Sequence, residues 1–357
     1  MLPVGLLPAI GRAFAVNDSL AGLLVTLYAV MVAVLAVPLT IATTRFGRKP
    51  LLLMTLLGYV LSNALVAVAP VFAVVAVGRG LGGITHALFF SLCIGYVPRV
   101  VPAASVGRAL TIVTGGASAG FVLGVPLSTS LGTAVGWRAA FAVLAVLAAV
   151  TLALVAKLLP AIPNGTRSKA AARGRGELAA VVASNGLTYL GQFTLYTFIS
   201  LLALRAGLRE SLIGPLLLVC GACGLIGLAY TAKTLDRSPR RTAILILGVV
   251  VVAVLGVAIG YPALIALVVL AAVWNGAFGG VPSIYQACAV RTKAVSPEMA
   301  GAWVNASANV GIGGGAAIGA GLLPVVGLGG LPWAAAGLLT AGLAVVICAR
   351  RAFPDRP

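Results

Sequence analysis

The chain has 357 residues, of which 61% are hydrophobic and only 8% are charged. Because so few charged side chains cannot cover a soluble protein of this length, most of the surface must contact lipid. The net charge of +18 would indicate a nucleic-acid partner in a soluble protein, but its confinement to alternate loops, described below, excludes that class.

The apolar residues form eleven blocks, each long enough to cross about 30 Å of hydrocarbon as a helix. In chain order the blocks are 20–41, 51–69, 71–97, 109–131, 139–156, 178–204, 212–232, 242–260, 262–290, 302–323 and 331–349. A shorter apolar stretch, residues 2–10, precedes them and would make only about 13 Å of helix. The pattern predicts an all-α integral membrane protein with eleven complete transmembrane helices and the remnant of a truncated first helix.

The basic residues alternate between the two ends of these predicted helices. One set of connections holds nineteen Lys and Arg residues, the opposite set holds four, and the remaining one, Arg79, lies inside a span. By the positive-inside rule the nineteen lie in the cytoplasm, together with the 160–177 connection and the C-terminus. We therefore expect a multi-pass protein of the cell membrane with a cytoplasmic C-terminus.

The sequence repeats itself with an offset of 192 residues. Residues 18–20 (Asp-Ser-Leu) recur as residues 210–212 (Glu-Ser-Leu), and the basic residues of 45–49 recur in 237–241. Two similar helical bundles in the same orientation explain this repeat. The predicted domains are an N-terminal bundle of residues 1–159 whose first helix is incomplete, a basic cytoplasmic linker of residues 160–177, and a C-terminal bundle of residues 178–357.

The loop after the first complete span carries a family signature. Residues 44–49 (Thr-Arg-Phe-Gly-Arg-Lys) are similar to the Gly-x-x-x-Asp-Arg-x-Gly-Arg-Lys signature of the major facilitator superfamily, with Thr40 and Thr44 in place of its Gly and Asp. Residues 236–241 resemble the second copy of this signature and retain the acid, as Asp236. Residues 85–90 and 136–141 are also similar to members of its drug:proton antiporter branch, which exports sugars, nucleosides and drugs.

The resemblance implies roles for these loops and for two glycine-rich helices. The loop residues would act as cytoplasmic latches that differ between inward and outward states, and these are Arg45, Gly47, Arg48, Lys49, Asp236 and Arg237. Small residues at four-residue spacing let helix backbones approach closely. The residues expected to pack in this way, some of them in a sequence similar to the antiporter signature, are Gly116, Gly120, Gly124, Pro126, Gly311, Gly315 and Gly319.

Two ionisable residues lie inside a predicted span, where a charge costs about 2.5–3.5 kcal/mol and therefore suggests a function. Arg79 and His86 are seven residues apart, which places them on one face of a helix. An unperturbed imidazole titrates near neutral pH, so both are candidates for proton coupling. The alternatives are a neutral His86 and an Arg79 that only make structural hydrogen bonds. None of the six acids lies within a predicted span.

Polar residues on the seventh and tenth helices, numbered as in the family, form a candidate substrate site. They recur on one face of each helix, and they are Asn185, Tyr189, Gln192, Tyr196, Asn275 and Gln286. The resemblance implies that the first, fourth, seventh and tenth helices line the central path. Amides and phenols suit an uncharged polar solute, although hydrogen bonding between helices would explain the same residues.

These features together predict a secondary active transporter that exports small organic solutes of the sugar, nucleoside or drug class by proton antiport with alternating access. No ATP-binding loop and no catalytic arrangement is present in the sequence, so we expect neither a pump nor an enzyme. We expect no cofactor or metal, and a monomer whose partners are the solute, protons and the lipid bilayer. The alternative is a non-transporting or degenerate carrier with a regulatory role.

Overall fold

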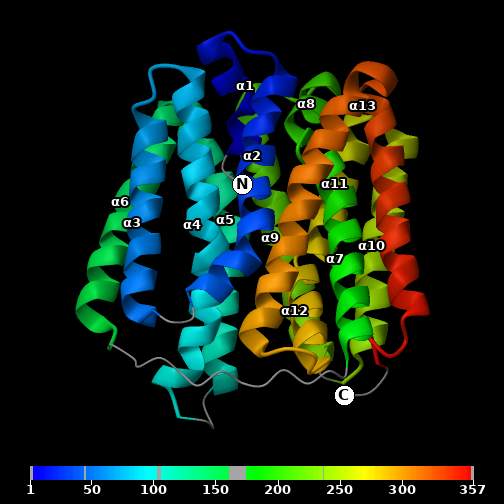
Figure 1. Ribbon diagram of the computed structural model, residues 1–357. Helices are drawn as coiled ribbons and strands as arrows, with labels where there is room; N and C mark the ends of the chain where they lie inside the picture. The colour runs from blue at the N-terminus through cyan, green and yellow to red at the C-terminus, as the bar shows by residue number, and fades with distance from the viewer. Residues whose placement is uncertain (1–2, 44–45, 103–105, 161–173, 236, 355–357) are drawn as a thin grey trace.

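The computed structural model describes residues 3–43, 46–102, 106–160, 174–235 and 237–354, and these residues form helices joined by short connections (Figure 1). Most of the helices are long and rich in exposed Leu, Val and Ile. Nine helical stretches of the described residues are long and apolar enough to cross a membrane. The all-α membrane class predicted from the sequence is confirmed.

The described residues of the first half form six helices. These are α1 (Pro3–Phe14), α2 (Asp18–Ala42), α3 (Arg48–Ala67), α4 (Phe72–Val100), α5 (Val106–Val135) and α6 (Trp137–Leu158). The Asn17 side chain accepts a hydrogen bond from the Leu20 N–H and so caps the start of α2. One apolar cluster joins α1 to α6 through Leu6, Ile10 and Phe141, and another joins α3 to α4.

The second half contains the remaining elements. These are α7 (Arg175–Tyr196), α8 (Ile199–Arg205), the short helix η2 (Glu210–Leu212), α9 (Ile213–Thr234), α10 (Pro239–Gly260), α11 (Leu264–Phe278), α12 (Val281–Arg291) and α13 (Pro297–Cys348). A single large apolar cluster connects them. The division of the chain at 160–177 remains a prediction, since residues 161–173 lie outside the described residues.

The last helix, α13, is two membrane crossings. Its 52 residues would measure about 78 Å as one straight helix, far more than a bilayer is thick. The backbone turns at Gly327, whose φ of 66° and ψ of −177° are not helical, and glycine adopts such a positive φ without a steric penalty. Both halves of α13 then pack against α7, through Gly311 at Tyr189 and Gly342 at Thr188.

Two predicted spans are interrupted where the sequence analysis expected continuous helices. The 178–204 span breaks between α7 and α8, and the 262–290 span breaks at Gly279 and Gly280 between α11 and α12. Gly279 is pressed against α9, because a Cβ placed on it would lie 2.0 Å from the carbonyl oxygen of Gly224. Pro282, which has no N–H to donate, stands in the first turn of α12.

The first helix is short but extends beyond the predicted 2–10 segment. The 12 residues of α1 make about 18 Å of helix, which is less than the thickness of the hydrocarbon. They lie at one end of the molecule beside α2 (Figure 1). There Leu6 packs on α5, where a Cβ placed on Gly132 would meet its side chain at 2.5 Å.

Helices of the two halves meet along α2 with α13, α4 with α13, and α5 with α9. The Thr26 hydroxyl donates to the Gly313 carbonyl across the first contact, at 3.3 Å. Ser130 of α5 lies against Gly214 of α9. These contacts position α4 and α7, which carry most of the candidate functional residues, on either side of α13.

Candidate functional site

Arg79 and His86 belong to a polar cluster built from three helices. Nδ1 of His86, on α4, is hydrogen-bonded to the Tyr59 hydroxyl of α3 at 2.5 Å. The guanidinium of Arg79 lies 4.3 Å from the centre of the Tyr28 ring of α2, and the Tyr28 and His86 ring centroids are 5.7 Å apart. We call Tyr28, Tyr59, Arg79 and His86 the α4 cluster.

Small residues on α4 bring the three helices together at this cluster. A Cβ placed on Gly83 would lie 2.5 Å from the Tyr28 carbonyl oxygen, and one on Gly82 would lie 2.6 Å from the Ser62 hydroxyl oxygen. The Ser62 hydroxyl donates to the Gly78 carbonyl at 2.7 Å. Close backbone approach therefore places the tyrosines of α2 and α3 against the face of α4 that carries Arg79 and His86.

The members of the α4 cluster differ in how well their polar atoms are satisfied. Arg79 is only 6% exposed, and its Nε has no hydrogen-bond partner among the described residues. His86, Tyr28 and Tyr59 are half-buried. The polar partner that burial of His86 demanded is thus present on another helix, whereas its role in proton coupling stays a prediction.

A second cluster of polar and aromatic side chains joins α7 to α11. The Trp274 indole N–H donates to Oε1 of Gln192, and the Gln192 amide donates to Oδ1 of Asn275 at 3.3 Å. The Tyr196 ring packs on Trp274 with centroids 6.2 Å apart. The structure therefore brings together three of the predicted substrate residues, Gln192, Tyr196 and Asn275.

The other predicted substrate residues lie apart from this cluster. Asn185 is fully buried and donates to the Val304 carbonyl and the Ser307 hydroxyl, at 2.9 and 2.7 Å. Tyr189 stacks on Phe193 within the apolar core. Gln286 lies beside Gly301. The contacts of Asn185 and Tyr189 are those of helix packing, the alternative left open by the sequence, because α7 is covered on both sides by α13.

A third polar group joins α7 to α12, where the Tyr285 hydroxyl is shared by Ser184 and Thr188, at 2.8 and 2.7 Å.

Two residues of the α4 cluster were missed by sequence reasoning. Tyr28 and Tyr59 were missed on α2 and α3. The available signal was a tyrosine inside an apolar span, since a buried phenol normally needs a hydrogen-bond partner.

Of the predicted latch residues, Lys49 contacts the end of another helix. The Lys49 ammonium donates to the Ala156 carbonyl at 2.9 Å. Gly47 precedes the first turn of α3 as its N-cap, and Arg48 behind it is buried. Arg237 is exposed. Arg45 and Asp236, the other two predicted latch residues, lie outside the described residues.

One ion pair joins the two halves at the opposite end from these loops. Arg12, in the last turn of α1, contacts Glu210 of η2 at 2.6 Å. Hydrogen bonding to Glu210, and then its charge, raises the pKa of Arg12. Both side chains are more than half exposed, so the pair contributes little to stability.

The predicted glycine ladders differ from each other. Gly311, Gly315 and Gly319 pack tightly on α7, with a Cβ on Gly315 falling 2.5 Å from the Leu190 carbonyl oxygen. On α5, a Cβ on Gly116, Gly120 or Gly124 would meet no described heavy atom within 4 Å. The close packing expected along this second ladder is therefore not seen among the described residues, although Leu6 of α1 packs on Gly132 further along α5.

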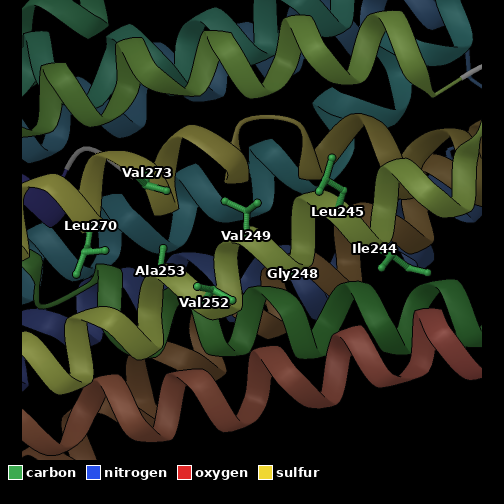
Figure 2. A pocket seen from close by; sticks show the side chains of 8 residues that line it. All are labelled: Ile244, Leu245, Gly248, Val249, Val252, Ala253, Leu270 and Val273. Carbon is green, nitrogen blue, oxygen red and sulfur yellow. The ribbon is translucent and has the colours of Figure 1, made fainter.

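An apolar groove of about 420 Å³ lies between α10 and α11 (Figure 2). Its lining residues are Ile244, Leu245, Gly248, Val249, Val252, Ala253, Leu270 and Val273. None of them is polar, and four have side chains that are more than one third exposed. This groove belongs to the lipid-facing surface and offers no hydrogen bond to a polar solute.

The long apolar helices, the helix contacts between the two halves and the polar clusters inside the helices define a multi-pass α-helical membrane protein of the transporter class. Residues 1–302 match the Major Facilitator Superfamily. The chain belongs to this family, and the resemblance stated from its motifs is confirmed. Members of the family are transporters that bind small-molecule substrates.

Curated relatives include both exporters and a protein named as a regulator. The chain is 31% identical to a chloramphenicol efflux pump of Mycobacterium tuberculosis, covering 96% of this chain and 86% of that protein. It is 28% identical to a protein named "Probable sugar efflux transporter" in Mannheimia succiniciproducens, covering 89% and 81%. It is 33% identical to the "Transcription regulatory protein OpdE" of Pseudomonas aeruginosa, covering 77% and 70%.

The fold is also similar to that of solved transporters. A bacterial homologue of the human lysosomal transporter Spinster, in an inward-facing and occupied conformation, aligns with a TM-score of 0.73 and 16% identity, covering 100% of this chain and 94% of that one. At this identity the similarity establishes the fold of the chain, which is that of the superfamily.

Proposed function

We propose that the protein is a secondary active exporter of small organic solutes of the drug, sugar or nucleoside class, acting as a monomer in the cell membrane with its C-terminus in the cytoplasm. The observation that carries the proposal is the match of nearly the whole chain to relatives named as efflux pumps for chloramphenicol and sugars. The polar clusters on α4 and α7 support it, because ionisable and amide groups inside membrane helices are costly unless they serve a purpose.

Proton antiport is the energy source that we propose, with His86 as the carrier and Arg79 beside it. His86 is half-buried and its Nδ1 is engaged by Tyr59, which leaves Nε2 as the nitrogen that can exchange a proton. The other charged or titratable groups that face it are Tyr28, Tyr59 and Arg79. No described acid lies inside a helix at this depth, so the imidazole is the best candidate there.

The test is transport by the purified chain in proteoliposomes. With an imposed pH gradient, we expect accumulation of at least one labelled solute among chloramphenicol, arabinose and uridine, and loss of accumulation when a protonophore is added. Empty liposomes and heat-inactivated protein are the controls. Transport at the same rate with and without the pH gradient would rule out proton antiport but would still support a transport function.

A regulatory membrane protein is the second candidate. The relative named as a transcription regulatory protein favours it, and so does the internal hydrogen bonding of Asn185, whose amide is used inside the fold. The proteoliposome assay separates the two candidates. A chain that binds solutes but moves none of them, with or without a gradient, supports the regulatory function.

A further inference from the structure

Arg79 is a buried cation without a described anionic partner. Four of the six acidic residues lie at helix starts or in short connections, namely Asp18, Glu177, Glu210 and Glu298, and the other two lie outside the described residues. Within the described residues, the guanidinium of Arg79 contacts the face of Tyr28, and its Nε is unpaired. A charge in such a place normally pairs with an acid or with backbone carbonyls.

Two other arginines show what a satisfied guanidinium looks like in this fold. Arg138 also stacks on an aromatic ring, 4.3 Å from the centre of Trp137, but it donates to the Ala69 carbonyl at 3.0 Å. Arg240 donates to the Val346 and Ile347 carbonyls at the end of α13, at 3.4 and 2.6 Å. Arg79 stacks on an aromatic ring but donates to no carbonyl among the described residues, so its Nε–H remains free to donate a hydrogen bond.

The residues around Arg79 suit an aromatic ligand that carries an acceptor group. Tyr28, Tyr59 and His86 present three rings, and each of these side chains keeps some exposed surface. Tyr28 also packs against an apolar cluster that includes Ala306 of α13, so the α4 cluster borders the contact between the two halves. Aromatic faces bind the apolar part of a ligand, while a guanidinium binds a carboxylate more strongly than a neutral acceptor.

We propose that the α4 cluster is a binding site for an organic anion, in which Arg79 holds a carboxylate or similar group and the rings of Tyr28, Tyr59 and His86 hold an aromatic or apolar part. The inference rests on the proposed transport function, and it names the class of substrate that the site in the N-terminal half binds.

Three probes of one ring system test this proposal. Indole-3-acetate is anionic, indole-3-acetamide is neutral and tryptamine is cationic at pH 7, and their binding to the full chain purified in detergent is measured by equilibrium dialysis. We expect indole-3-acetate to bind at least tenfold more tightly than the amide, and tryptamine to bind most weakly. Equal binding of the three probes overturns the proposal.

Variants assign the preference to Arg79. In Arg79→Gln the preference for the anion over the amide should disappear while the affinity for the amide stays within about threefold, and Arg79→Lys should keep part of the preference. The matched control is Arg138→Gln, which removes another arginine stacked on a ring and should leave the preference unchanged. A preference that survives in Arg79→Gln, or that is equally lost in Arg138→Gln, contradicts the site.

Binding in detergent requires no transport, so the two proposals fail separately. If the protein discriminates the probes through Arg79 but moves no solute in proteoliposomes, the anion site is supported and the exporter function is contradicted. If the protein exports neutral solutes but binds the three probes equally, the exporter function is supported and the anion site is contradicted. If Arg79→Gln and Arg79→Lys both elute as aggregates, anion preference in the wild-type chain, competed by benzoate and not by benzamide, decides the proposal.

Discussion

Polar side chains inside the helices differ in whether they have partners. Tyr285 shares its hydroxyl with Ser184 and Thr188, and Ser184 also donates to the Gly342 carbonyl. By contrast, Nε of Arg79 and Oδ1 of Asn185 are buried with no hydrogen-bond partner in the described part of the chain. A satisfied polar group stabilises the fold, whereas a buried polar group without a partner costs free energy.

The Tyr285 network can be tested by removing one hydroxyl. Tyr285→Phe should lower the free energy of unfolding by about 0.5–2 kcal/mol, because Thr188 loses its partner on another helix. The apparent melting temperature of the detergent-purified protein measures this. Tyr230→Phe is the matched control, since that ring is 39% exposed, and its melting temperature should not change. Equal effects of the two substitutions would contradict a role for the buried network.

His86 is tested through the pH profile of transport. In His86→Ala the dependence of efflux on pH should flatten, because alanine neither titrates nor forms a hydrogen bond, while membrane insertion is preserved. Tyr59→Phe keeps the imidazole and removes its partner at Nδ1, so its pH profile should shift without flattening. A His86→Ala variant with the wild-type rate and pH profile would reduce His86 to a packing residue.

Among the helices, α13 and α5 use the same glycine spacing in different ways. On α13 the ladder is in contact with α7 along its length, and a Cβ on Gly311 would lie 2.4 Å from that of Tyr189. On α5 the three glycines meet nothing described within 4 Å, although Gly132, on the same face, is covered by Leu6. Glycines at four-residue spacing permit close approach, but close packing also requires a second helix to lie against them.

Alanine substitutions separate the two ladders. Gly311→Ala and Gly315→Ala should each destabilise the protein by about 1–3 kcal/mol, because the added methyl group would overlap backbone atoms of α7. Gly116→Ala and Gly120→Ala should be neutral or stabilising by up to about 1 kcal/mol through helix propensity. Thermal unfolding in detergent distinguishes them. Destabilisation of similar size on both helices would show that another surface covers the α5 ladder.

In the whole molecule, the two halves are held together along α13 and at the end that carries Arg12 and Glu210. The ion pair is exposed and contributes only about 0.2–1 kcal/mol. The pair nevertheless joins the last turn of α1, in the first half, to η2 in the second half. The two halves also meet where Ser130 of α5 packs against Gly214 of α9.

A cross-link across this ion pair should stop alternating access. The Arg12→Cys, Glu210→Cys double variant, with exposed Cys348 changed to Ser, is treated with a bis-maleimide reagent. We expect proteoliposome transport to fall at least tenfold, because the two halves can no longer separate at this end. Each single cysteine variant treated in the same way serves as the control. Full transport by the cross-linked protein would mean that this end stays closed throughout the cycle.

The sequence by itself determined the class and the family of this protein. Long apolar blocks predict transmembrane helices because an isolated span must satisfy its own backbone in lipid, and this requirement is local. The loop signature and the glycine spacing are likewise contiguous in the chain, so they identified the superfamily without knowledge of any contact. The polar faces of α4 and α7 were found for the same reason, through helical periodicity.

Only the tertiary structure decided which of those polar residues have partners. Asn185 and Gln192 lie on the same predicted polar face of one helix. Asn185 nevertheless bonds to α13, while Gln192 bonds to Trp274 and Asn275 of α11. Tyr59 and His86 are 27 residues apart and meet where Gly82 lets α4 approach Ser62 of α3. A hydrogen bond between helices depends on their rotation and depth in three dimensions, and no periodicity within one helix specifies either.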